Sequence, residues 1–224
     1  MTNRQKRKIY NWLSAILPDF GVFKRFRKAF LRRCGVFVHQ SVDLCGTVRF
    51  VGDGEVVIGE NSIIRDGVFF HVAQGGRIEL GQNVTVAENA ILESIPSLDE
   101  STLLKFGDNV TFMMGSIASA NGNATVRVGN NCKIAHNVSI KASGHKIVPD
   151  GKCIAEDCIF RDITISDGCW ICAGAIILPG VTVGRWNVVA AGAVVTKDTP
   201  DCVLMAGVPA VLKKNYPRIS RCRQ

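Results

Sequence analysis

The sequence predicts a mainly β protein: a parallel β-helix built from six-residue repeats, preceded by a short helical segment. Residues 165–200 divide without interruption into the blocks ISDGCW, ICAGAI, ILPGVT, VGRWNV, VAAGAV and VTKDTP. Every block begins with Ile or Val, and its fifth residue is small or of moderate size. A period of six fits neither the 3.6-residue period of a helix nor the alternation of a simple strand. It is the repeat of a hexapeptide β-helix.

Each block of such a repeat forms one flat side of a triangular coil, and successive coils stack about 4.8 Å apart. The aliphatic first residue and the small fifth residue both point into the shaft, the fifth near a corner. Glycine recurs at the fourth position, beside the corner, where a positive φ is useful. These glycines are Gly168, Gly174, Gly180 and Gly192. We therefore expect residues 165–200 to form two full coils.

The same repeat runs less regularly upstream, from Val38 to Ile140. Its groups of aliphatic residues are separated by more than multiples of six, which predicts loops that leave the shaft. These loops are expected near 51–57, 70–79, 95–105 and 119–127. The longest break runs from His145 to about Thr164 and predicts a long loop there.

The 224 residues are long enough for one domain with a full core. We divide the chain into a basic amphipathic helical segment (1–33), a β-helix domain (34–200) and a C-terminal strand with a basic tail (201–224). No run approaches the ~18 apolar residues of a membrane-spanning helix. The N-terminus lacks the pattern of a signal peptide, and nine cysteines without a disulfide pattern suggest a reducing compartment. We therefore expect a cytoplasmic protein.

Residues 3–17 and 22–33 read as two short amphipathic helices. Each places its large apolar residues on one face; these are Ile9, Trp12, Leu13, Ile16, Phe23, Phe26 and Phe30. Residues 1–33 carry a net charge of +9, so the remaining residues sum to −1. Two compatible interpretations stay open: a helical cap over the open end of the shaft, or a peripheral anchor on the anionic inner membrane face. No nucleic-acid partner is expected.

One cysteine pair resembles a redox or zinc motif, Cys169-Trp-Ile-Cys172. Such a motif needs a second pair or a thioredoxin-like context. Cys169 instead occupies an inward fifth position of the repeat, which favours a structural role. We expect no metal site.

Four histidines occur in the chain, and His145 differs from the others in its position. His39, His71 and His136 are expected to be plain surface residues. A β-helix shaft is packed solid, so a ligand must bind outside it or between copies. His145 stands at the point where the regular shaft gives way to the long loop. That loop is suited to form one side of such a groove.

At these residues the sequence resembles the hexapeptide-repeat acyltransferases, and most closely the branch with galactoside, maltose and polysaccharide O-acetyltransferases. The likeness covers roughly 34–214 as a repeat. It is specific in three segments: HNVSI and SGHKI within 136–147, WICAGAIILPGVTVGRWNVVAAGAVVTKD at 170–198, and AGVPAVLKK at 206–214. The resemblance implies a left-handed coil and a homotrimer with sites between subunits.

The resemblance also implies acetyl transfer from acetyl-CoA to a hydroxyl of a sugar or glycan. The family's catalytic histidine falls on His145. A neutral imidazole can accept the proton of a hydroxyl as its oxygen attacks the thioester. Glu156 falls near a family acid and would orient the acceptor or His145, although Asp157 lies one residue away.

For CoA, the family pattern maps onto Trp170, Ala173, Ala191, Thr196 and Lys197. Small side chains there let the pantetheine arm lie against the backbone, whereas simple corner packing explains the two alanines nearly as well. Lys213 and Lys214 are further candidates for the CoA phosphates, because the basic residue that the family often has near the AGVP motif is replaced by Val211. The family's acceptor-contacting asparagine has no secure counterpart, and Asn121 and Asn123 are the candidates.

Other functions stay open on the sequence alone. A non-catalytic β-helix scaffold is one, and acetylation of an antibiotic or another small hydroxylated or amino acceptor is another. A zinc hydratase of this fold needs three converging histidines, and no pair here has one-coil spacing. A serine acetyltransferase would carry a larger N-terminal helical region.

Overall fold

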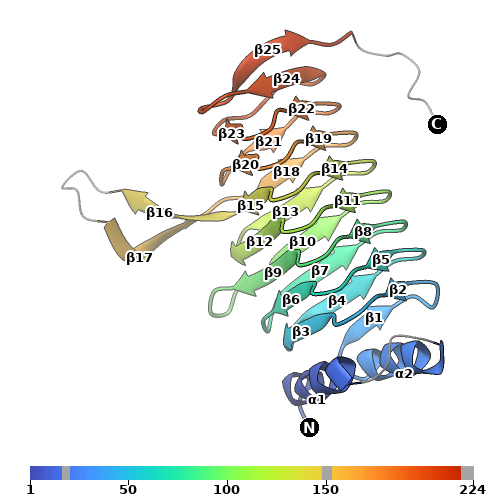
Figure 1. Cartoon of the computed structure of the whole chain (residues 1–224). Coiled ribbons are helices and arrows are strands. Elements are labelled where there is room, and N and C mark those ends of the chain that lie inside the picture. The colour runs from blue at the N-terminus through green and yellow to red at the C-terminus, as the bar shows by residue number, and fades with distance from the viewer. Residues whose placement is uncertain (17–20, 148–152, 218–224) are drawn as a thin grey trace.

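The computed structural model describes residues 1–16, 21–147 and 153–217. It shows a shaft of stacked coils with two helices across its N-terminal end and a two-stranded arm on its side (Figure 1). The described helices are α1 (Asn3–Ile16) and α2 (Gly21–Arg32). The mainly β architecture and the helical N-terminal segment agree with the sequence prediction.

Three faces of strands make up the shaft, and each coil adds one strand to each face. The strands within each face are parallel, except for the last strand of the second face. The first face contains β1 (Val36–Val38), β4 (Glu55–Ile58), β7 (Gly76–Leu80), β10 (Thr102–Phe106), β13 (Thr125–Val128), β18 (Ile163–Ile165) and β21 (Thr182–Val183). The second contains β2 (Asp43–Leu44), β5 (Ile63–Ile64), β8 (Thr85–Val86), β11 (Thr111–Phe112), β14 (Lys133–Ile134), β19 (Trp170–Ile171), β22 (Val188–Val189), β24 (Val203–Ala206) and β25 (Val211–Asn215). The third contains β3 (Arg49–Gly52), β6 (Phe69–Val72), β9 (Ile91–Pro96), β12 (Ile117–Gly122), β15 (Ser139–Lys141), β20 (Ile176–Ile177) and β23 (Val194–Val195).

The regular blocks of residues 165–200 face the shaft as their spacing predicts. All six first-position residues, from Ile165 to Val195, are buried, and so are all six fifth-position residues, from Cys169 to Thr199. Gly168 and Gly192 turn their corners with positive φ. Trp186 takes the glycine's place at one corner, with φ of 58°.

The N-terminal coils are wider than the regular ones. Val36 pairs with Val56 and Leu80 with Phe106, twenty and twenty-six residues on, whereas Ile165 pairs with Val183, eighteen residues on. The prediction that loops leave the shaft at 51–57, 70–79 and 119–127 is therefore wrong. The additional residues lengthen the strands of the third and first faces and push their common corner outward; only 97–101 of the fourth predicted loop lies between strands.

Aromatic side chains fill the wider lumen. Phe50 and Phe70 stack with ring centroids 4.8 Å apart, and both are completely buried. Phe106 and Phe112 pack against each other two coils beyond Phe70, with ring centroids 5.1 Å apart. Close packing of this kind leaves no room for a ligand inside the shaft.

The arm is an antiparallel hairpin of β16 (Ser143–Ile147) and β17 (Cys153–Phe160), at the place where the sequence predicts the longest loop. It leaves the shaft between β15 and β18 and projects sideways (Figure 1). Its root is fixed because the ring of Phe160 lies directly over Gly122, where any β-carbon would collide with the ring. A glycine with φ of 66° is needed there for both space and conformation.

The C-terminal end is closed by β24, parallel to β22, and by β25, which returns antiparallel to β24. Asn187 is buried beneath it and donates to Thr199 Oγ1 at 2.8 Å and to the Pro200 carbonyl at 2.7 Å. Its side-chain oxygen accepts from the Val203 amide at 2.8 Å. Within the described part of the chain, no helix is long and apolar enough to span a membrane.

Candidate active site

His145 lies at the root of the hairpin arm, on β16, and its side chain is exposed. Its partner across the hairpin is Cys158, and the Cys158 Sγ lies 3.8 Å from His145 Nδ1. The hairpin register brings these two side chains together because directly opposed residues of an antiparallel pair share one face. The second ring nitrogen, Nε2, is the one available to an acceptor.

A row of polar side chains leads across the third face to the hairpin root. Ser119 Oγ lies 2.8 Å from Glu93 Oε2 and 3.1 Å from Asn121 Oδ1, and its single proton serves one of them at a time. Asn121 Nδ2 donates to Ser143 Oγ at 3.0 Å, two residues before His145. Of the two asparagines considered from sequence, Asn121 therefore joins this row, whereas Asn123 is an exposed residue beyond it.

The row continues to His71, which the sequence analysis treats as a plain surface residue. His71 Nδ1 lies 4.0 Å from Glu93 Oε1, and both side chains are partly buried. His71, Glu93, Ser119 and Lys141 occupy one register position in consecutive coils. Glu93, Ser119 and Cys158 are not among the site residues that the sequence predicts. Glu93 and Ser119 stand at outward positions of consecutive coils, which becomes visible only with the correct strand register.

Trp170 projects from the second face and is 52% exposed. In register across this face, Trp170 stands beside Val188, Val188 beside Leu204, and Leu204 beside Lys214. Trp170 and Lys214 are thus about 14 Å apart along one line, since strands are spaced by about 4.8 Å. An aromatic surface at one end and a cation at the other suit a long ligand with a charged terminus.

Ala173 and Ala191 lie at one corner of successive coils, between the second and third faces, and both are exposed. The Gly192 amide donates to the Ala173 carbonyl at 2.9 Å. A β-carbon built on Gly192 meets nothing within 4 Å, and one on Gly174 meets only a backbone atom at 3.9 Å. At earlier turns of this corner, such as Gly115, the side chain of the next coil fills this space. The open corner fits a slim ligand chain lying against the backbone.

The remaining cofactor candidates are exposed lysines and a threonine. Thr196 and Lys197 follow β23, at the corner of the shaft from which the hairpin leaves two coils earlier. Lys213 and Lys214 lie on β25, with Lys214 Nζ 5.4 Å from the centroid of the Tyr216 ring. Neither pair contacts His145 in any described interaction.

The structure therefore distributes the predicted site residues over two parts of one chain. His145, Thr196 and Lys197 lie toward the corner between the third and first faces. Trp170 lies on the second face, and Ala173 lies at the corner between the second and third faces. The shaft separates these two residues from His145. Glu156 belongs to β17, but its side chain, like that of Asp157, lies outside the described residues, so its predicted role stays a prediction.

The cysteine pair of the Cys169-Trp-Ile-Cys172 motif is divided between interior and surface. Cys169 is buried in the shaft and its thiol donates to the Gly184 carbonyl at 3.1 Å. The neighbouring Cys132 thiol and burial raise the pKa of Cys169. Burial raises the pKa of the Cys172 thiol. Both are free thiols, and the burial of Cys169 in the shaft favours the structural role. Among the residues that the structure describes, no group of three His, Cys, Asp or Glu side chains is arranged to hold a metal ion.

Comparison with known proteins supplies a family for this arrangement. The family described as "Bacterial transferase hexapeptide (six repeats)" matches residues 162–197. A putative acetyltransferase of Dictyostelium discoideum is 35% identical over 133 residues, which cover 59% of this chain and 68% of that protein. The chain belongs to the hexapeptide-repeat transferases.

Two further proteins are similar to the chain. Galactoside O-acetyltransferase of Lactococcus lactis is 35% identical over 112 residues, 48% of this chain and 54% of that enzyme. The chain spans about half to two thirds of the length of the curated relatives it matches. The solved polysialic acid O-acetyltransferase OatWY superposes with a TM-score of 0.66 at 17% identity, covering 84% of this chain and 90% of that one. This likeness is one of fold, a left-handed parallel β-helix.

Proposed function

We propose that this protein transfers an acetyl group from acetyl-CoA to a hydroxyl of a sugar or glycan. The observation that carries the proposal is the exposed imidazole of His145 at the hairpin root, next to the hydrogen-bonding row that ends at Asn121 and Ser143. A base beside amide and hydroxyl groups suits the recognition and deprotonation of a sugar hydroxyl. Curated relatives that are named galactoside O-acetyltransferases support the same reaction and acceptor class.

His145 acts as the general base through Nε2. For that nitrogen to be bare, Nδ1 carries the imidazole proton and directs it toward Cys158 Sγ. As Nε2 removes the hydroxyl proton, the acceptor oxygen bonds to the acetyl carbon and the carbon–sulfur bond breaks. The proton then passes from Nε2 to the departing sulfur, so the products are the acetyl ester and free CoA.

The groups expected to hold CoA fit its chemistry. The open corner at Gly174 and Gly192 admits the slim pantetheine chain. Trp170 offers an exposed aromatic surface beside it, and Lys197, Lys213 and Lys214 offer exposed cations for the phosphates. Much of the rate would come from holding two substrates together.

A homotrimer completes the site. Because Trp170 and His145 lie on different parts of the shaft, a copy that presents its second face to the hairpin corner of its neighbour joins the two sets. Three such head-to-tail contacts close a ring. Under this interpretation, His145 of one copy and Trp170 of its neighbour serve one reaction.

A thiol-release assay tests the proposed reaction directly. Purified protein is incubated with acetyl-CoA and a panel of sugars, nucleotide sugars and lipid-linked glycans, and free CoA is measured with a thiol reagent. We expect release that depends on one class of acceptor and an added acetyl group on that acceptor by mass spectrometry. Binding of acetyl-CoA without transfer to any hydroxylated acceptor would instead indicate a scaffold.

A further inference from the structure

The helix α1 is turned opposite to the usual arrangement of an amphipathic helix on a protein surface. Its inward face is polar, and the buried residues are Arg7, Tyr10 and Ser14. Its outward face is apolar: Ile9 is 41% exposed, Trp12 64% and Ile16 57%. A surface helix normally buries its apolar stripe and exposes its charges.

The backbone at the end of the shaft explains this orientation. The first coil has no preceding coil to pair with, so its outer carbonyl and amide groups need other partners. Arg7 donates to the Cys34 carbonyl at 3.1 Å and to the Gly54 carbonyl at 2.5 Å. Asn11 donates to the Phe50 carbonyl at 2.9 Å and accepts from the Phe50 amide at 3.0 Å.

The helix α2 continues the same pattern. Its buried Arg27 donates to the Gly46 carbonyl. Lys28 donates to the carbonyls of Gln40 and Val42 at 2.8 and 3.0 Å. Since the side chains that bond to the coil are polar, apolar side chains remain outside, among them Val22 at 78% and Phe26 at 50% exposure.

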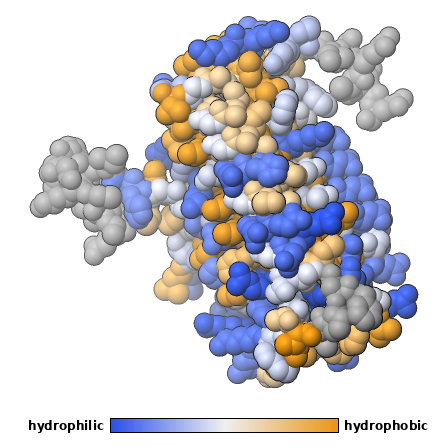
Figure 2. Space-filling model, viewed as in Figure 1, coloured by the Kyte–Doolittle hydropathy of each residue, from blue (hydrophilic) through white to orange (hydrophobic). Residues whose placement is uncertain are grey.

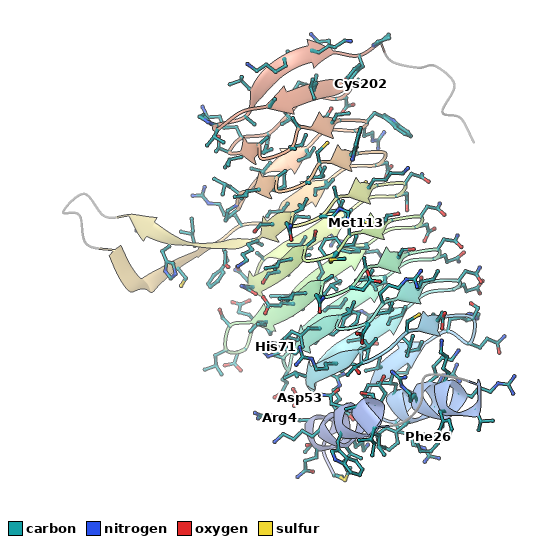
Figure 3. All side chains as sticks on the ribbon, viewed as in Figure 1. Arg4, Phe26, Asp53, His71, Met113 and Cys202 are labelled. Carbon is teal, nitrogen blue, oxygen red and sulfur yellow. The ribbon has the colours of Figure 1, made fainter. Side chains whose placement is uncertain are left out.

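The outcome is one apolar surface at the end of the molecule, here called the cap face. It consists of Met1, Ile9, Trp12, Ile16, Val22 and Phe26. Some hydrophobic residues are visible at this end in Figure 2, and Figure 3 shows Phe26 directed away from the shaft. Large apolar residues exposed together at one end of a protein indicate an interaction site.

Basic side chains border the cap face. Arg4, Lys8, Arg25 and Arg33 are exposed, and Arg25 also lines a shallow hollow with Lys28 and Arg32. The described parts of the two helices contain no Asp or Glu. The partner must therefore be both apolar and anionic. A second copy of the chain would place the same positive charge against this one.

We propose that the cap face docks on the surface of an anionic lipid bilayer. Trp12 and Phe26 would enter the boundary between headgroups and acyl chains, where amphipathic helices with aromatic and aliphatic faces insert. The surrounding arginines and lysines would meet the lipid phosphates. Docking at this end leaves the hairpin with His145 on the side of the shaft, clear of the bilayer.

Vesicle sedimentation of the full chain tests this docking. We expect sedimentation with vesicles of phosphatidylcholine and phosphatidylglycerol, little with phosphatidylcholine alone, and release at high salt because the attraction is screened. Trp12→Ser combined with Phe26→Ser should weaken binding roughly tenfold or more. Leu98→Ser is the matched control, because Leu98 is 91% exposed but lies on the turn between β9 and β10.

The charge contribution is tested separately. Arg4→Gln combined with Arg25→Gln should weaken vesicle binding roughly 25-fold. The control is Arg65→Gln combined with Arg127→Gln, which removes the same charge from the shaft and should change vesicle binding little. Melting temperatures should stay unchanged in all these variants, since the side chains are exposed. Equal sedimentation with both kinds of vesicle, or wild-type binding by the Trp12 and Phe26 variant, would overturn the proposal. A change of oligomeric mass in that variant without lipid would also overturn it, because the cap face would then join two copies.

Discussion

At the scale of single residues, the proposed reaction depends on one nitrogen of His145. Its Nδ1 faces Cys158 Sγ at 3.8 Å, which leaves Nε2 for the acceptor. His145→Ala should therefore lower turnover by roughly a hundredfold or more. The KM for acetyl-CoA should change little, because the residues proposed to hold CoA lie elsewhere. Steady-state kinetics by thiol release measures both quantities.

His136→Ala provides the control for that substitution. His136 is also exposed, but it lies in the turn between β14 and β15, away from the hairpin. Its removal should leave turnover within about twofold of wild type. Retention of full activity by His145→Ala would exclude that residue from the chemistry.

Cys158 is a positioning residue in this account. Cys158→Ala should lower kcat severalfold and leave the KM for acetyl-CoA unchanged, since loss of the contact frees the ring to adopt either tautomer and other orientations. Cys158→Ser restores a polar partner of similar size and should recover most of kcat. If the alanine and serine variants behave alike, the contact with Nδ1 does not orient the imidazole.

Sequence alone made His145 the candidate base because it is a histidine at the place where the repeat breaks, and this stays a prediction. It did not identify Cys158, since the partner of His145 depends on hairpin register, which a loop of this length does not reveal. Nor did it identify Glu93 and Ser119, because they become neighbours only when coils of unequal length are stacked.

At the scale of elements, the orientation of α1 leads to a stability prediction. Arg7→Met should lower the free energy of unfolding by about 2 kcal/mol, because buried carbonyls at the end of the shaft lose their donor. The corresponding fall in melting temperature is about 4–8 °C. Ile9→Ser on the outer face of the same helix should change it by less than about 2 °C. Thermal unfolding followed by circular dichroism compares the two, and a larger loss in Ile9→Ser would contradict the orientation.

The same elements show how far the sequence could predict the fold. The regular coils of 165–200 were predictable because their inward positions repeat every six residues. The wider coils were not predictable. Residues in excess of a multiple of six fit equally well with a loop and with two longer strands. Alternation within a strand distinguishes them: Val56 and Ile58 are buried, whereas Glu55 and Val57 are only partly covered. For α1, periodicity showed which residues share a face, but only the carbonyls of the first coil determine which face turns inward.

At the scale of the whole molecule, the proposed site needs more than one copy. Sedimentation velocity at micromolar concentration should give the mass of three chains. Each chain would contribute the hairpin with His145 to one site and the second face with Trp170 to another. A monomeric mass would leave the two sets apart and contradict the proposed assembly.

Mixed trimers test this account most directly. His145→Ala and Trp170→Ala are each prepared, mixed in equal amounts, dissociated and reassembled, and acetyl transfer is compared with that of each variant alone. In a closed ring, a site is intact where an unchanged His145 meets an unchanged Trp170, which holds for about a quarter of the sites. We predict that the mixture recovers about a quarter of wild-type activity while each variant alone stays inactive. A reassembled mixture with no more activity than its parts would show that His145 and Trp170 serve one site within a single chain, and would contradict the account.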